Sequence, residues 1–314
     1  MRRLLIVVVV LLIAGGGAFW WLTAPVPVIS ADLANSIESG GDAERGKIVF
    51  NAGGCAACHV SQGQPEDAVD RLKLGGGLEL KSPFGSFFAP NISPDPDDGI
   101  GKWKVADLVN AMQAGVSPTG YHYFPAFPYT TYTHAKVEDI RDLMAFLRTL
   151  APMKGKAPAH TIAFPFNIRR ALGIWKLLYL DHTPVAADPA RNDKWNRGKY
   201  LVEALGHCAE CHSARNAIGG IQEQYRFAGG PDLEGKDWVP NITQHKDGIA
   251  DFSEKDISYM LKTGDTPDGD SVGGSMVAVV RNTAELPDSD RDAIAAYIKS
   301  LPPREGPPKP PKKE

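Results

Sequence analysis

Cys55-Ala56-Ala57-Cys58-His59 and Cys208-Ala209-Glu210-Cys211-His212 are the two stretches that decide how this chain folds. Both have the form C-x-x-C-H, and together they contain all 4 cysteines of the 314 residues. In this pattern two thiols add to the vinyl groups of a haem, and the adjacent histidine becomes an axial ligand of the iron. The stretches therefore predict two covalently bound haem c groups, attached through Cys55, Cys58, Cys208 and Cys211.

His59 and His212 are the predicted first axial ligands of the two irons. A four-cysteine zinc site or two disulfides would also use paired cysteines. Neither alternative needs a histidine directly after the second cysteine of both pairs, so the haem interpretation is favoured.

The sequence repeats itself downstream of each haem motif. Pro90-Asn91-Ile92-Ser93 in the first half matches Pro240-Asn241-Ile242-Thr243 in the second. Each half closes with an amphipathic helical pattern, at 137–150 and at 289–301. No stretch of either half reads as alternating strands. We therefore expect an all-α fold with two tandem cytochrome c-like domains that follow an N-terminal transmembrane helix.

A glycine occurs at matching places in the helices that lead into the two motifs. Arg45-Gly46-Lys47 precedes the first motif and Arg197-Gly198-Lys199 the second. Glycine inside a helix costs about 1 kcal/mol relative to alanine, so a repeated glycine indicates a structural reason. We expect each helix to cross the closing helix of its half closely, near Phe146 or Tyr297.

The N-terminus predicts a membrane segment. Arg2 and Arg3 precede an uncharged run from Leu4 to Thr23 that ends with Trp20-Trp21, a length that suits a helix crossing the bilayer. The arginines favour the cytoplasmic side and the tryptophans the outer interface. We expect an uncleaved single-pass anchor in a bacterial inner membrane, with both haem domains in the periplasm; the alternative is a cleaved signal peptide.

These patterns divide the chain into six parts. The Pro- and apolar-rich linker is expected to pack along both domains, the alternative being a surface for a partner. A net charge of -3 gives no reason to expect a nucleic-acid partner. The expected parts are the anchor 1–24, a spacer 25–41 that holds the first domain off the membrane, domain one 42–151, the linker 152–193, domain two 194–303, and a disordered Pro/Lys tail 304–314.

The sixth ligand of each iron distinguishes the two halves. Met276, in a Gly-rich loop before the closing helix, is the predicted ligand of the second iron. Met276 follows Gly248 by 28 residues, and the residue 28 positions after the matching Gly99 is Phe127. Phenylalanine cannot bind iron. We predict a histidine ligand for the first iron, with His134 ahead of His122; the alternatives are a more distant methionine and an open, five-coordinate iron.

The chain resembles the membrane-associated multihaem cytochrome c subunits of periplasmic alcohol and sugar dehydrogenases, over residues 42–303. The resemblance implies electron transfer from a catalytic dehydrogenase subunit through covalent haems to the respiratory chain. Members often carry three haem motifs and a methionine at the position of Phe127 or near Ala135, and this chain departs from both patterns. The stretches that carry the resemblance are Cys55–His59, Pro90–Ser93, Gly120–Tyr132, Phe164–Arg169, Trp195–Gly198, Cys208–His212 and Met276 with Val280–Thr283.

The leading hypothesis is a membrane-anchored dihaem cytochrome c that performs no bond chemistry itself. Its expected partners are a periplasmic dehydrogenase subunit and a respiratory oxidase or quinol-oxidising complex. A second hypothesis is a haem enzyme or gas sensor whose first iron is open to a small ligand. A third is a subunit that only tethers a catalytic partner to the membrane.

Overall fold

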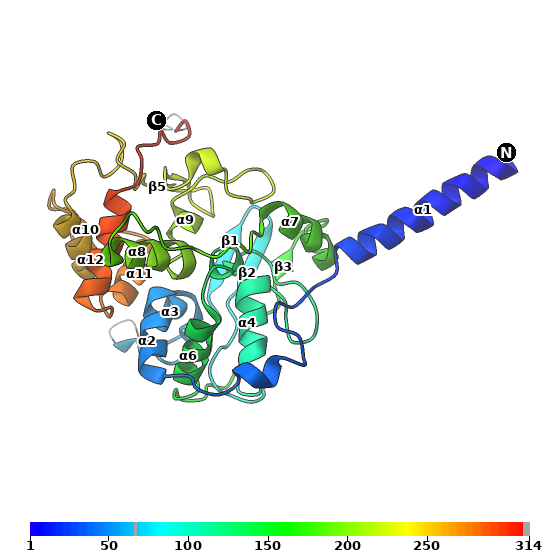
Figure 1. The fold of residues 1–314 in the computed structure, drawn as a ribbon, viewed down its shortest axis with the longest axis horizontal. Helices are drawn as coiled ribbons and strands as arrows, with labels where there is room; N and C mark the ends of the chain where they lie inside the picture. The colour runs from blue at the N-terminus through cyan, green and yellow to red at the C-terminus, as the bar shows by residue number, and fades with distance from the viewer. Residues whose placement is uncertain (66–67, 310–314) are drawn as a thin grey trace.

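The computed structural model describes residues 1–65 and 68–309. Helix α1 (Arg2–Leu22) projects away from a body that contains both haem motifs (Figure 1). Among the described residues, α1 is the one helix long and apolar enough to cross a membrane. The body is mostly helical, as the sequence predicts.

Within the described residues, each half of the body has a helix before the haem motif, a short motif helix and three later helices, and the second half adds the short turns η4 and η5. The first half contains α2 (Ala43–Ala52), α3 (Cys55–His59), α4 (Val105–Ala114), α5 (Tyr129–Tyr132) and α6 (Val137–Leu147). The second half contains α8 (Asp193–Tyr200), η4 (Leu201–Leu205), α9 (Cys208–Cys211), η5 (Glu223–Tyr225), α10 (Glu254–Thr263), α11 (Met276–Thr283) and α12 (Asp288–Lys299). The buried side chains of the two halves form one continuous core.

Two small sheets add to the helices. Antiparallel β1 (Glu79–Ser82) and β2 (Gly85–Phe88) pair with Leu80 opposite Phe87, and β3 (Thr161–Ile162) of the linker joins the edge of β2. A second pair, β4 (Gly230–Pro231) and β5 (Trp238–Val239), lies in the second half. These strands are too short to produce a visible alternation in the sequence.

The crossings predicted at the two glycines are confirmed. A Cβ on Gly46 would lie 1.9 Å from the Asp142 carbonyl oxygen of α6, and a Cβ on Gly198 would lie 1.8 Å from the Ala293 carbonyl oxygen of α12. An arginine one residue earlier reinforces each crossing. Arg45 Nε lies 2.7 Å from an Asp142 carboxylate oxygen, and Arg197 Nη2 lies 2.8 Å from the Asp290 carboxylate.

We expected the spacer to hold the first domain away from the membrane. In the structure the spacer instead packs on that domain. Ile29 donates its backbone N–H to Asn110 Oδ1 at 2.7 Å, and Glu38 accepts from the backbone N–H of Val105 at 2.9 Å. The segment contains one 3₁₀ turn, η1 (Ala34–Ile37). The Asn110 side chain satisfies the backbone of Ile29, and the Glu38 side chain satisfies that of Val105, so hydrogen bonds fix the spacer in place.

Part of the expected disordered tail is also ordered against the body. The Arg304 carbonyl accepts from Asn241 Nδ2 at 2.8 Å, and Lys309 Nζ lies 5.8 Å from the centre of the Trp238 ring. Residues 310–314 lie outside the described residues. The same device occurs in the first half, where Asn91 Nδ2 donates to the Met153 carbonyl at 2.6 Å.

The linker packs along both domains, as its composition favoured. It contains η3 (Arg169–Ala171) and α7 (Leu172–Tyr179). Trp175 Nε1 donates to the Ile218 carbonyl of the second half at 2.9 Å. Lys176 Nζ donates to the Ala114 carbonyl at the end of α4, in the first half, at 2.6 Å.

Candidate haem sites

The two motif histidines are held in the same orientation. His59 Nδ1 lies 2.8 Å from the Pro90 carbonyl oxygen, and His212 Nδ1 lies 2.8 Å from the Pro240 carbonyl oxygen. A carbonyl only accepts, so Nδ1 carries the proton and the lone pair of Nε2 is available to a metal. Burial lowers the pKa of both histidines despite these hydrogen bonds, which keeps the rings neutral. Both sites therefore fit a haem iron.

The motif cysteines are free thiols spaced by one turn of helix in α3 and α9. Burial raises the pKa of Cys55 and of Cys208 to about 12, so neither is a reactive thiolate. No group of three or more His, Cys, Asp or Glu side chains arranged to hold a metal ion occurs in residues 1–65 and 68–309. The three-residue spacing of each pair of thiols on one helical turn fits attachment of a haem by thioethers.

The two attachment sites adjoin each other at the domain boundary. His207, directly before Cys208, has its Nε2 3.3 Å from the carbonyl oxygen of Gly53, two residues before Cys55. Helix α11 of the second half contacts α2 and α3 of the first, and α5 of the first half contacts η4 of the second. Each haem motif thus packs against the opposite domain.

Polar contacts lock this domain boundary. Glu210, inside the second motif, accepts from Thr130 Oγ1 at 2.7 Å and Thr131 Oγ1 at 3.1 Å, and pairs with Arg215 at 2.5 Å. Burial alone would raise the pKa of Glu210, but the charge of Arg215 and the hydroxyl of Thr130 outweigh burial and lower it. Arg71 Nη2 donates to Asn282 Oδ1 across the boundary at 2.5 Å. Sequence reasoning missed this boundary because its partners are far apart in the chain.

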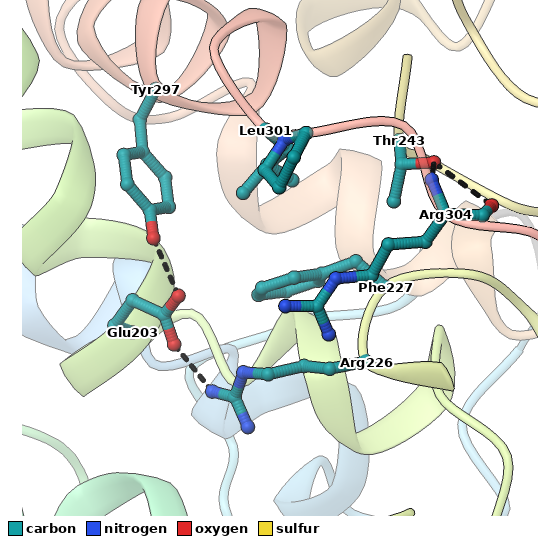
Figure 2. Close-up of a pocket in the computed structure, with 8 residues that line it drawn as sticks. Glu203, Arg226, Phe227, Thr243, Tyr297, Leu301 and Arg304 are labelled. Carbon is teal, nitrogen blue, oxygen red and sulfur yellow. Dashed lines mark hydrogen bonds and ion pairs between the residues drawn. The ribbon is translucent and has the colours of Figure 1, made fainter. Parts of the chain in front are cut away.

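A further polar group is centred on Glu203, five residues before Cys208 in the chain (Figure 2). The Glu203 carboxylate accepts from Tyr297 Oη at 2.6 Å and pairs with Arg226, beside a cavity of about 170 Å³. Glu203 belongs to η4, a π-helical turn. Cys208 lies ten positions after Gly198, whereas Cys55 lies nine positions after Gly46. One inserted residue commonly produces a π turn, so this spacing was the signal that could have revealed it.

Replacing Arg226 with glutamine is expected to destabilise the holoprotein by about 2 kcal/mol, below the range for a fully buried pair, because Glu203 then lacks its cation. Chemical denaturation followed through haem absorbance measures the loss. Arg226→Lys, which keeps the charge, is the control and should lose less. Equal losses for both variants would show that the charge of Arg226 is not what matters.

The structure aligns Phe127 with Met276. An antiparallel bridge joins Val116 to His122 in the first half and Asp265 to Ser271 in the second. In both loops a backbone N–H returns to the glycine that ends the preceding helix, at 2.8 Å. The count of residues is therefore conserved up to Phe127 and Met276. Met276 is half-buried and packs against the core, and the Phe127 ring packs on the rings of Tyr123 and Tyr132.

The two histidines predicted for the first iron differ in which ring nitrogens are free to bind a metal. His122 is 3% exposed; its Nε2 lies 2.9 Å from the Thr23 carbonyl oxygen and its Nδ1 lies 3.0 Å from Lys176 Nζ. Both ring nitrogens of His122 are thus engaged. His134 Nδ1 lies 2.6 Å from the Thr183 carbonyl oxygen, which leaves Nε2 as the nitrogen that can bind a metal.

Comparison with known proteins agrees with this geometry. The cytochrome c family model matches residues 43–151 and 196–302. A diheme cytochrome c-type protein of Cereibacter sphaeroides is 51% identical over 263 residues, which cover 83% of this chain and 86% of that protein.

Two dehydrogenase subunits are also similar. The fructose dehydrogenase cytochrome subunit of Gluconobacter japonicus is 36% identical over 261 residues, which are 82% of this chain and 52% of the subunit. The quinone-type alcohol dehydrogenase cytochrome c subunit of Gluconobacter oxydans is 33% identical over 270 residues, which are 82% of this chain and 54% of that subunit. The chain thus spans about half of these subunits. It belongs to the cytochrome c family as a dihaem, electron-transferring member with two covalently bound haem c groups.

Proposed function

We propose that this chain is a single-pass, membrane-anchored dihaem cytochrome c that carries electrons from a periplasmic dehydrogenase subunit to a respiratory acceptor. The observation that carries the proposal is the pair of haem motifs that adjoin at the domain boundary, each with its histidine oriented by a proline carbonyl. The similarity to dehydrogenase cytochrome subunits supports a dehydrogenase as the donor. The apolar helix α1 supports the anchor.

The residues around the motifs hold the two redox sites in place. When bound, haem supplies the one-electron chemistry. The carbonyls of Pro90 and Pro240 fix the rings of His59 and His212, and Glu210 holds the two domains together through Thr130. A fixed separation between the sites favours rapid electron exchange because no domain movement is needed.

The proposed ligand sets give the two sites different potentials. We assign His59 and His134 to the first iron and His212 and Met276 to the second. A histidine and a methionine would give the second haem a higher reduction potential than two histidines would give the first. With both haems bound, electrons would pass from the first domain to the second. A redox titration in which the haem bound by Met276 has the lower potential would contradict this direction.

The function is tested in membranes of a bacterium that makes the chain. Deleting its gene is expected to abolish the electron flow from one periplasmic dehydrogenase to oxygen, measured as substrate-driven respiration. The wild-type gene should restore the flow, and a Cys55→Ala/Cys58→Ala variant should not. Restoration by that variant would favour a purely tethering role, and unchanged respiration after deletion would contradict the proposal.

One observation favours the second candidate function, a first iron open to a small ligand. Phe127, whose side chain cannot bind iron, occupies the position of Met276 and packs on the Tyr132 ring. If the first iron is five-coordinate, the reduced protein will bind carbon monoxide rapidly at one haem. Low-temperature electron paramagnetic resonance of the oxidised protein decides between the candidates, because bis-histidine and high-spin iron give different signals.

A further inference from the structure

Helix α7 of the linker is amphipathic in the opposite sense to a helix of a water-soluble domain. Its leucines face outward: Leu177 is 64% exposed and Leu178 is 62% exposed. Ile174, one turn earlier, is exposed as well, whereas the charged Lys176 is only 8% exposed. A helix on an aqueous surface normally buries its leucines and exposes its lysines.

The buried lysine fixes this orientation. Lys176 Nζ donates to the carbonyls of Ala114 at 2.6 Å and Gly115 at 2.7 Å, which end helix α4. The ammonium group also lies 4.8 Å from the centre of the Tyr129 ring. The negative end of α4 and the face of an aromatic ring both attract a cation. Turning α7 to bury its leucines would break all of these contacts.

The apolar surface continues into the residues before α7. Phe164 is 78% exposed, and Phe166 and Ile168 are also exposed. We call Phe164, Phe166, Ile168, Ile174, Leu177 and Leu178 the linker apolar face. Single exposed apolar residues are ordinary, but six between residues 164 and 178 indicate a surface that is covered in the working protein.

The end of the membrane helix lies directly against this segment. Thr23, the residue after α1, is fully buried, and its Oγ1 accepts from Arg170 Nε at 2.9 Å. The Arg170 guanidinium lies 4.1 Å from the centre of the Trp20 ring. A Cβ on Gly173 would lie 2.5 Å from the Thr23 Cα, so only glycine permits this approach. In Figure 1, α7 lies where α1 leaves the body.

We propose that the linker apolar face lies in the outer interface of the bilayer that α1 crosses. The inference rests on the proposed anchor. Its occupant is phospholipid, because Trp20 and Trp21 at the end of α1 mark the depth of the interface, and the contacts of Thr23 hold α7 at that depth. Arg170 donates to Thr23 Oγ1 and to the Trp20 carbonyl, so it ties the linker to the end of α1. The face thereby fixes the orientation of the haem domains on the membrane.

The test uses the full-length holoprotein in vesicles of phosphatidylcholine and phosphatidylglycerol. The haems occupy the native cysteines, so Leu178→Cys can carry a single spin label. Tyr259→Cys on α10, also an exposed apolar position, is the matched control. We expect the ratio of relaxation by oxygen to relaxation by a water-soluble nickel chelate to be several-fold higher at 178 than at 259, with unchanged haem spectra.

Other outcomes are distinguishable. Equal ratios at the two positions, while the protein floats with the vesicles, would overturn the inference and leave the anchor intact. Failure to float would overturn the anchor and this inference together. A label at 178 that is shielded from both reagents in vesicles and in detergent would assign the face to a second copy of the chain, which also overturns the assignment to lipid.

Discussion

Replacing Gly46 or Gly198 with alanine is expected to destabilise the holoprotein by about 3 kcal/mol, at the upper end for overpacking of a core. At Gly46 the new methyl group would lie 1.9 Å from the Asp142 carbonyl oxygen and 2.9 Å from Phe146 Cβ. A backbone carbonyl cannot rotate aside, so α2 and α6 must separate. Separation would also stretch the 2.7 Å contact between Arg45 and Asp142. The higher helix propensity of alanine relative to glycine offsets only about 1 kcal/mol of this loss of stability.

Denaturant unfolding followed by far-ultraviolet circular dichroism measures this loss for each variant. Lys47→Ala is the control, because it also introduces an alanine into this helix, at an exposed position rather than at the close contact that Gly46 makes with α6. It should alter the free energy of unfolding by less than about 0.5 kcal/mol. A Gly46→Ala protein as stable as the wild type would show that the helices can move apart without loss.

The repeated parts of the fold could be predicted because the same local pattern occurs twice. Two Arg-Gly-Lys triplets predicted both helix crossings, and two C-x-x-C-H motifs predicted both haem sites. The packing of the spacer on the first domain could not be predicted, because Ile29 is held by Asn110, which is 81 residues away in the chain. Such a contact leaves no periodicity near either residue.

The ligand candidates show the same limit. The sequence placed His134 ahead of His122 because His134 lies beside Ala135, near which members of the family that the chain resembles often carry a methionine. What engages His122 is the Thr23 carbonyl, 99 residues away in the chain, together with Lys176 of the linker. The residue counts that identified Met276 and Phe127 as equivalents stay valid in the structure, because both loops keep the same backbone hydrogen bonds.

Single substitutions at 276 and 127 are expected to have opposite effects on iron ligation: the first removes a sulfur ligand from one haem, and the second supplies one to the other. The proposed ligation predicts that Met276→Ala removes the sixth ligand of the second iron, so one haem should become high-spin and bind carbon monoxide. Phe127→Met should supply a sulfur ligand to the first iron. Its potential should then rise by about 0.1 V, a small part of the roughly 0.8 V range that axial ligands control.

Potentiometric titration and electron paramagnetic resonance of both variants measure these changes, with Met260→Ala in helix α10 as the control that removes a methionine elsewhere in the second domain. A second haem that stays low-spin in Met276→Ala would show that Met276 is not its ligand. The Phe127→Met result also bears on the first iron. A sulfur ligand that displaces a histidine shifts the potential without changing the spin state, whereas one that fills an open position converts high-spin iron to low-spin. Loss of a low-spin signal in His134→Ala would identify His134 as the group displaced.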